Sequence, residues 1–288
     1  MDLVSAADLR AFLDASPAVA VVEVVETRGS TPREKGAWML VSARATLGTI
    51  GGGQLEFLAI DRARELIRQN VATGAMDIPL GPEIGQCCGG RVELAISLVD
   101  GARRAELEAR TRAEEAARPH VLVFGGGHVG HALAAALSLL PLAVTVIETR
   151  AEALDGIVPG VATRLTPVPE EAARGAPPGS AFVVLTHDHA LDFLIVAEAL
   201  NRPDAAYVGM IGSKTKKATF RSWYLREAGG TEERFARLVS PIGGAELDDK
   251  RPAVIAALAA AEIMRALGAR QVARAHAPGA DAVEPSVR

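Results

Sequence analysis

The sequence has few aromatic residues, few cysteines and no excess of positive charge, and each shortage excludes a class of protein. Aromatic residues make up 4% of the 288 residues, which disfavours the stacked-aromatic surfaces of many single-strand nucleic-acid binders. The formal net charge is −4, so a nucleic acid is not the expected partner. Hydrophobic residues, at 49%, are in contrast ample for one large or two ordinary folded domains.

Long hydrophobic runs and export signals are also missing. The longest uncharged stretch, residues 132–147, is interrupted by Pro141, so no membrane span is expected. The N-terminal residues MDLVSAADLR have no apolar core and do not resemble a signal peptide. The two cysteines, Cys87 and Cys88, are adjacent and poorly placed for a relaxed disulfide. These features predict a soluble cytoplasmic protein.

The order of the expected elements predicts an α/β fold class, with a mixed α/β N-terminal domain followed by a Rossmann-like parallel-sheet domain. In the first part, strands are expected at 20–27, 37–42, 46–50 and 91–99, and helices at 6–15 and 54–69. From residue 120, strands at 121–124, 143–148, 181–186 and 206–211 alternate with helices, which indicates parallel pairing. A last helix is expected at 253–267.

A change in composition suggests where the domains divide. Residues 101–118 are rich in alanine, glutamate and arginine and have no continuous apolar stripe, which is typical of an exposed linking helix. We therefore expect a first domain at 1–105, a charged linker helix at 106–119, a Rossmann-like domain at 120–270 and a disordered tail at 271–288.

The segment VLVFGGGHVGHAL has the glycine spacing of a dinucleotide-binding turn, with Gly125, Gly127 and Gly130 between a strand and a helix. His128 lies within this turn, and Glu148 ends the next strand, where an acidic side chain can accept from a ribose hydroxyl. The pattern fits a dinucleotide such as NAD. The alternatives are a different phosphate-bearing ligand and a turn that binds no ligand.

Two further segments follow expected strands and carry polar side chains. LTHDHALD contains His187 and Asp188, which suit acid–base or metal chemistry, although Asp188 could simply cap the next helix. GMIGSKTKK places Lys214 at a helix start, where it could contact a phosphate or belong to a solvated basic helix.

The N-terminal domain contains three glycine-rich segments with charged or sulfur-containing residues. Arg33 lies in the loop GSTPREKG, and Gly51–Gly53 offer backbone amides to an anion at a helix start. The segment GQCCGGR groups two thiols with Arg91, which suits a soft ligand or an electropositive thiolate. The alternative is that both cysteines are small buried hydrophobic residues.

Seven motifs follow one another in the chain: ETRGSTPREKGAWMLV, GTIGGGQLE, GQCCGGRVEL, VLVFGGGHVGHAL, LTHDHALD, YVGMIGSKTKK and SPIG. Together they resemble the xanthine dehydrogenase accessory protein family of the XdhC/CoxI type, over about residues 15–265. The resemblance implies a chaperone rather than a catalyst. Such a protein binds the molybdenum cofactor, a molybdopterin, while a cysteine desulfurase sulfurates it, and then inserts it into the molybdenum subunit of xanthine dehydrogenase. A homodimer is implied as well.

The expected site residues follow from these motifs, and none is assigned a catalytic role. Cys87 and Cys88 are the only thiols and are the candidates for lying near the molybdenum. The candidate cofactor-binding residues are Arg33, Gly51, Gly52, Gly53, Gln86, Cys87, Cys88, Arg91, Gly125, Gly127, His128, Gly130, Glu148, His187, Asp188 and Lys214.

Two other functions compete with this one. An NAD(P)-dependent oxidoreductase would use the glycine turn and Glu148, and it predicts stoichiometric nicotinamide binding. A nucleotide-gated regulatory module, similar to potassium-uptake regulators, would bind partners in a nucleotide-dependent way. Neither alternative gives a role to the adjacent cysteines or to the GSTPREKG loop.

Overall fold

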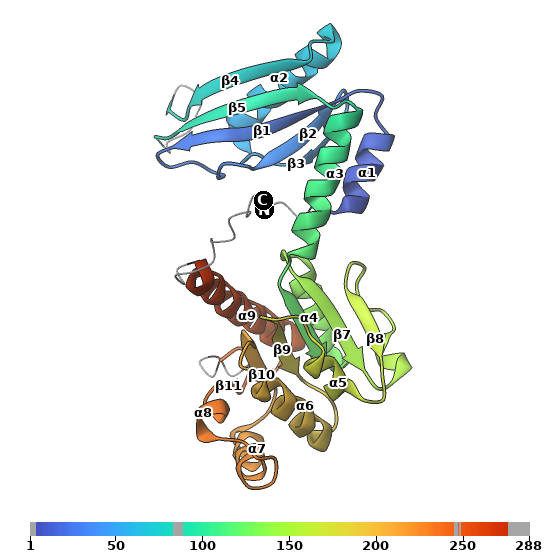
Figure 1. Ribbon diagram of the computed structural model, residues 1–288, viewed down its shortest axis with the longest axis vertical. Coiled ribbons are helices and arrows are strands. Elements are labelled where there is room, and N and C mark those ends of the chain that lie inside the picture. Colours follow the sequence, from blue (N-terminus) through green and yellow to red (C-terminus); the bar gives the residue numbers. More distant parts are fainter. Residues whose placement is uncertain (1–3, 83–88, 245–246, 248, 276–288) are drawn as a thin grey trace, which may run out of the picture. The chain divides into compact units, whose positions relative to one another are not determined.

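A computed structural model describes residues 4–82, 89–244, 247 and 249–275. The chain forms two compact units (Figure 1). We call Met1–Ala117 the N-terminal unit and Arg118–Arg288 the Rossmann unit. Each unit is described below by itself.

The N-terminal unit is a five-stranded antiparallel sheet, in the order β3-β2-β1-β5-β4, between helices (Figure 1). Residues alternate between its two faces, as the pleat of a strand requires. Ala20, Val22 and Val24 pack with helix α2, while Val19 and Val21 pack with helices α1 and α3. The elements are α1 (Ala6–Asp14), β1 (Val19–Arg28), β2 (Trp38–Ser42), β3 (Thr46–Gly48), α2 (Gly53–Gln69), β4 (Thr73–Pro79), β5 (Arg91–Leu98) and α3 (Gly101–Ala116).

Helix α3, where the sequence predicts a linker over 106–119, is part of the N-terminal unit. Its Leu107 is buried in the core between α1 and the sheet. Both Arg103 and Arg110 form ion pairs with Glu23 of β1. The charges that suggest a solvated linker therefore hold this helix on the sheet. The two units divide after Ala117, within the stretch 105–119 where the sequence predicts the boundary, but the helix belongs to the first unit.

The Rossmann unit is a six-stranded parallel sheet in the order β11-β10-β9-β6-β7-β8 (Figure 1). Numbered from its first strand, this order is 3-2-1-4-5-6 read from the β8 edge, that of a doubly wound dinucleotide-binding fold. One face packs against α4 and α9, the other against α5, α6 and α7. The elements are β6 (His120–Phe124), α4 (His128–Ser138), β7 (Ala143–Glu148), η2 (Ala151–Leu154), β8 (Ala162–Leu165), α5 (Pro169–Arg174), β9 (Ala181–Val184), α6 (His189–Asn201), β10 (Tyr207–Met210), α7 (Lys214–Arg226), α8 (Glu232–Phe235), β11 (Leu238–Val239) and α9 (Pro252–Ala275).

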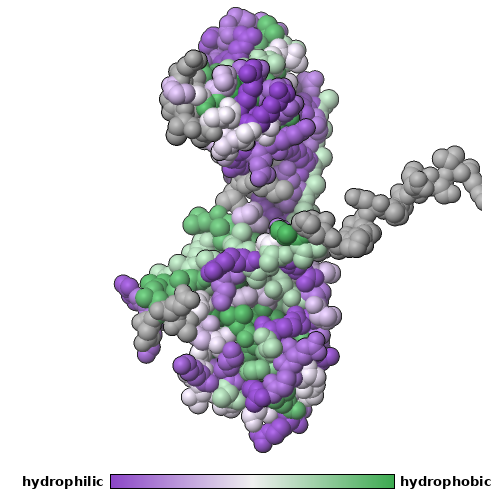
Figure 2. All heavy atoms as spheres, turned by 90° about the vertical axis from the view of Figure 1, so that its left-hand side faces the viewer, coloured by the Kyte–Doolittle hydropathy of each residue, from purple (hydrophilic) through white to green (hydrophobic). Residues whose placement is uncertain are grey.

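Helix α9, with 24 residues, is the longest of the described helices. Its stretch Pro252–Ala273 could cross a membrane by length and composition, although one such helix is weak evidence for a span. Ile263 and Leu267 are buried in the core that α9 shares with α4. Figure 2 shows the side of the Rossmann unit on which α9 lies, and this side has pale green, moderately hydrophobic areas. The exposed residues of α9 are mostly alanine. The sequence predicts a disordered tail from residue 271, whereas residues 271–275 belong to helix α9. Residues 276–288 lie outside the described residues.

Candidate functional site

Two of the glycine-rich motifs of the N-terminal unit meet at one end of its sheet. Strand β1 ends beside the start of β5, with Arg28 opposite Arg91. The chain beyond β1 then forms a β-bridge from Ser30 to Gly89. A Cβ atom on Gly90 would overlap the Ser30 carbonyl oxygen, so a glycine is required at this contact between the two backbones.

The third glycine-rich motif packs onto the first. Gly51 has a φ of +125°, and a Cβ atom there would lie 2.7 Å from Pro32 Cβ and 3.4 Å from Arg33 Cγ. Gly52 and Gly53 also have positive φ angles, which glycine adopts without strain. The structure therefore places Arg33 beside the glycine turn at the start of α2.

The backbone amides of this turn are already bonded within the chain. Glu56, in the first turn of α2, accepts from the backbone N–H of Ile50 at 3.2 Å and of Gly52 at 3.0 Å. It also accepts from the Thr49 hydroxyl at 2.5 Å, and that hydroxyl accepts from the Gly51 N–H. A carboxylate of the protein thus occupies the position that the sequence suggests for an external anion.

Arg91 is engaged with a neighbouring strand. Its Nε and Nη2 atoms donate to the two carboxylate oxygens of Asp77, at 2.6 and 2.5 Å. The Arg91 guanidinium holds the pKa of Asp77 below its usual value. Gln86, Cys87 and Cys88, which the sequence groups with Arg91, lie outside the described residues.

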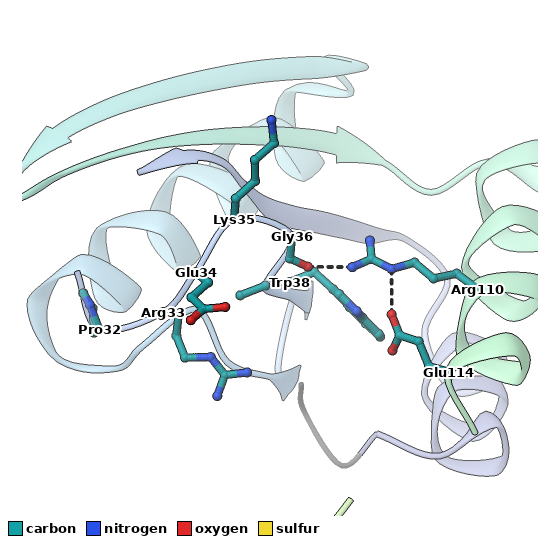
Figure 3. Close-up of a pocket in the computed structure, with 9 residues that line it drawn as sticks. Pro32, Arg33, Glu34, Lys35, Gly36, Trp38, Arg110 and Glu114 are labelled. Carbon is teal, nitrogen blue, oxygen red and sulfur yellow. Dashed lines mark hydrogen bonds and ion pairs between the residues drawn. The ribbon is translucent and has the colours of Figure 1, made fainter. Parts of the chain in front are cut away.

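A pocket of about 580 Å³ lies between the loop that contains Arg33 and helix α3 (Figure 3). Its volume is in the range of small-molecule sites. Arg110 of α3 joins the two walls, because Nη2 donates to the Gly36 carbonyl at 2.5 Å and Nε donates to Glu114 at 3.0 Å. The sequence gives no sign of the α3 side chains at this loop, since only the fold brings them there. The lining residues are Pro32, Arg33, Glu34, Lys35, Gly36, Ala37, Trp38, Arg110 and Glu114.

In the Rossmann unit, the predicted glycine turn joins β6 to α4 and is tightly packed. A Cβ atom on Gly125 would lie 2.5 Å from the Leu185 carbonyl oxygen, and one on Gly130 would overlap the Gly125 carbonyl. Gly127 differs, because a Cβ atom there would meet no atom within 4 Å. It is the N-cap of α4 and has no side-chain cap. The backbone at Gly127 can therefore approach a phosphate, with the exposed His128 next to it.

Glu148 ends β7 as predicted, but its carboxylate bonds to its own surroundings. Oε2 accepts from the Gly126 N–H at 3.0 Å, and Oε1 accepts from the Thr149 N–H at 2.8 Å. The Arg150 guanidinium adds an ion pair at 3.3 Å. Glu148 is 4% exposed. Although burial opposes ionisation, these donors lower the pKa of Glu148 to about 2. The phosphate part of a dinucleotide site fits this turn, whereas a ribose would compete with five donors for Glu148.

The histidine-containing segment that follows β9 is organised by its aspartates. Asp188 is the N-cap of α6 and accepts from the Ala190 N–H at 2.8 Å. Asp192 is fully buried and forms an ion pair with Lys216 of α7. It also accepts from the Thr186 hydroxyl at 2.7 Å. This buried pair was not singled out from the sequence, where 24 residues separate its members.

The remaining predicted side chains at this end of the parallel sheet lie at the surface. His187 and His189 are exposed, and Lys214 is exposed at the start of α7, which Ser213 caps. Within the described residues, no group of three or more histidine, cysteine, aspartate or glutamate side chains is placed to hold a metal ion.

The chain matches two family models and is similar to known proteins. Residues 12–76 match the XdhC and CoxI family, and residues 121–263 match the XdhC Rossmann domain. The uncharacterized protein YqeB of Escherichia coli K12 is 30% identical over 281 residues, an alignment that includes 93% of this chain and 46% of YqeB. The chain thus spans about half of that relative's length.

A solved structure from Bacillus halodurans, described as a xanthine dehydrogenase, has the same fold. The TM-score is 0.78, and the superposition covers 96% of this chain and 98% of that one, at 18% sequence identity. The two matched models together cover most of the N-terminal sheet and the Rossmann unit. The chain belongs to the XdhC and CoxI family.

Proposed function

We propose that this protein is an accessory factor for the maturation of xanthine dehydrogenase, and not itself a catalyst. In this proposal it binds molybdopterin with its molybdenum in the cytoplasm, as a homodimer. It holds this cargo while a cysteine desulfurase replaces an oxo ligand with sulfide, and then passes it to the molybdenum subunit of xanthine dehydrogenase.

The observation that carries the proposal is the meeting of the three glycine-rich motifs at one end of the N-terminal sheet. The Ser30 backbone contacts Gly89 and Gly90, and the side chains of Pro32 and Arg33 pack on Gly51, so residues from three distant segments form one surface. Arg33 and Arg91 lie there, Arg91 in an ion pair with Asp77, and guanidinium groups suit the phosphate of molybdopterin. The adjacent thiols of the GQCCGGR segment would supply soft ligands near the molybdenum.

The proposal is tested by the cargo that the purified protein retains. The chain is produced in a host that makes the cofactor and is supplied with molybdate. Molybdenum is then measured by mass spectrometry and pterin by fluorescence after oxidation, each relative to protein concentration. We expect about one of each per chain, and a severalfold loss in Cys87→Ala/Cys88→Ala and in Arg91→Ala.

A matched control is Arg44→Ala. Arg44 is exposed in the turn between β2 and β3, at the opposite end of the sheet, because that turn follows the pairing of Ser42 with Val19 at the start of β1. Its variant should retain the cargo. Absence of both molybdenum and pterin from the unmodified protein would refute the proposal, and full retention in the cysteine and Arg91 variants would move the site elsewhere.

The Rossmann unit offers a phosphate-binding backbone at Gly127, and we propose a nucleotide such as NAD as its ligand. An NAD(P)-dependent oxidoreductase is the competing function. Because Glu148 is bonded to the Gly126 N–H, we expect weak NAD binding and no hydride transfer. Calorimetry of the full chain with NAD and with ATP, followed by a search for nicotinamide turnover, separates the two functions.

A further inference from the structure

A buried ion pair lies at the carboxyl end of the Rossmann sheet. Asp192 of α6 is fully buried, the Lys216 side chain of α7 is 8% exposed, and Lys216 Nζ donates to Asp192 Oδ2. Two charges taken out of water in this way contribute little more to stability than well-packed apolar side chains of similar volume. Stability alone therefore does not account for the pair, and the bonds that it makes to its surroundings indicate another role.

The carboxylate of this pair fixes the chain directly after β9. Asp192 Oδ1 accepts from the Thr186 N–H at 3.0 Å and from the Thr186 hydroxyl at 2.7 Å. Lys216 reaches the other carboxylate oxygen from the neighbouring helix, and Gly212 leaves it room, because a Cβ atom on Gly212 would lie 2.6 Å from Lys216 Cδ. The segments LTHDHALD and GMIGSKTKK are therefore bonded to each other through one carboxylate.

The Thr186 backbone lies against the glycine turn. A Cβ atom on Gly125 would be 2.5 Å from the Leu185 carbonyl oxygen and 3.0 Å from the Thr186 nitrogen. Strand β6, which leads into this turn, and strand β9, which ends shortly before Thr186, are the neighbours at which the strand order of the sheet reverses. Ligands of doubly wound folds bind at such a point. Thr186 is therefore next to the turn whose Gly127 backbone is open to a phosphate.

One exposed side chain is held at this place. His187 follows Thr186 and precedes Asp188, whose N–H donates to the Thr186 hydroxyl at 3.2 Å and whose carboxylate caps α6. The backbone on both sides of His187 is thus fixed by hydrogen bonds, whereas the His187 side chain is exposed. An imidazole N–H is a suitable donor to a phosphate oxygen.

We propose that Asp192 is a positioning residue of the nucleotide site in the Rossmann unit. It holds Thr186 so that His187 donates to a phosphate of the nucleotide, while the backbone at Gly127 contacts the phosphates from the glycine turn. Lys216 is the counter-charge, because it neutralises a buried carboxylate that would otherwise repel the phosphates. The inference rests on the nucleotide ligand proposed for this unit and requires no molybdopterin.

The test compares two variants that both lack the ion pair. Asp192→Asn/Lys216→Met keeps an oxygen that accepts from Thr186, whereas Asp192→Leu/Lys216→Met has none. Neither variant leaves an unpaired charge in the core, so both should fold, which circular dichroism checks. Calorimetry of the full chain with ATP and with NAD gives the affinity. We expect the asparagine variant to bind within about threefold of the unmodified chain, and the leucine variant at least tenfold more weakly.

Two further substitutions follow the same chain of contacts. Thr186→Val removes the hydroxyl and keeps the ion pair, and it should weaken binding severalfold. His187→Ala should weaken binding about tenfold. Adding Asp192→Leu and Lys216→Met to His187→Ala should cause little further loss, because the positioning has no effect once the imidazole is gone.

A matched control removes a different ion pair from α7. Arg221→Gln/Glu232→Gln separates an exposed pair between α7 and α8, and it should leave the affinity unchanged. Full affinity in the leucine variant, equal losses in the asparagine and leucine variants, or losses that multiply when His187→Ala is added would each overturn the inference. If the leucine variant does not fold, full affinity in Thr186→Val overturns it instead.

The outcome is separable from those of the proposed functions. If the unmodified chain binds neither ATP nor NAD, the nucleotide ligand and this inference are both refuted. Full binding by a folded leucine variant refutes the positioning role and leaves the nucleotide ligand in place. Molybdenum and pterin, measured on the same preparations, test the accessory function independently.

Discussion

Replacing Glu148 with glutamine should destabilise the Rossmann unit by an amount that depends on pH. In the folded chain, the bonds from Gly126, Thr149 and Arg150 lower the pKa of Glu148 from an ordinary 4.5 to about 2. At about 1.4 kcal/mol per pH unit, this difference corresponds to roughly 3 kcal/mol of folding free energy at pH 7. Glutamine keeps the shape and one acceptor oxygen but cannot carry the charge.

The sign of the pH dependence follows from a folded-state pKa that lies below the unfolded one. The stabilisation is complete above pH 4.5 and is lost as the pH falls from there toward 2. The gap in unfolding free energy between the unmodified protein and Glu148→Gln should therefore narrow by about 1.4 kcal/mol between pH 7 and pH 3.5. At still lower pH the protonated glutamic acid resembles glutamine, so the gap closes.

Urea denaturation measures this gap if the reporter is confined to the Rossmann unit. Trp223 packs against Phe193 and Phe220 there, and Trp38→Phe makes it the only tryptophan. Glu152→Gln is the control, because Glu152 is exposed and four residues away. A gap below about 1 kcal/mol at pH 7, or one that stays constant down to pH 3.5, would refute the role assigned to the Glu148 bonds.

Two further substitutions in the Rossmann unit have clear expected outcomes. Asp192→Asn should lower the unfolding free energy by about 3–5 kcal/mol, because it leaves Lys216 buried without its counter-charge, and adding Lys216→Met should recover part of the loss in urea denaturation. Gly130→Ala should lower the melting temperature, followed by circular dichroism, far more than Gly127→Ala, because only at Gly130 would the new methyl group overlap the Gly125 carbonyl. Equal melting temperatures for the two alanine variants would contradict the packing described for this turn.

Much of the fold can be predicted from the sequence where strands bury their side chains in a regular pattern. The β-branched run at 20–27 predicts β1, and the apolar runs at 121–124 and 143–148 predict β6 and β7 within one residue. Three strands escape prediction: β4, β8 and β11. All three are edge strands; β4 and β8 have mostly exposed side chains and β11 has only two residues, so none of them has a strong hydrophobic period.

The role of helix α3 could not be predicted because it depends on long-range pairing. Its arginines are typical of a solvated helix until Glu23, about 80 residues earlier, is placed between two of them. The same holds for the pocket, in which Trp38 and Glu114 come from different segments. The glycine positions, in contrast, were recognisable, because spacing alone indicates where two backbones must come close.

The glycine-rich turns of both units contain a carboxylate from the chain itself, and this changes how such turns are interpreted. Glu56 occupies the amides of the first turn and Glu148 an amide of the second. An external anion at either amide must displace a charged group that is already well bonded, so glycine spacing alone overestimates the room for a ligand. A ligand can still reach the backbone at Gly127 in the Rossmann unit and the side chains of the pocket between the Arg33 loop and α3 in the N-terminal unit. We therefore expect side chains, more than turn amides, to determine which ligand the N-terminal unit selects.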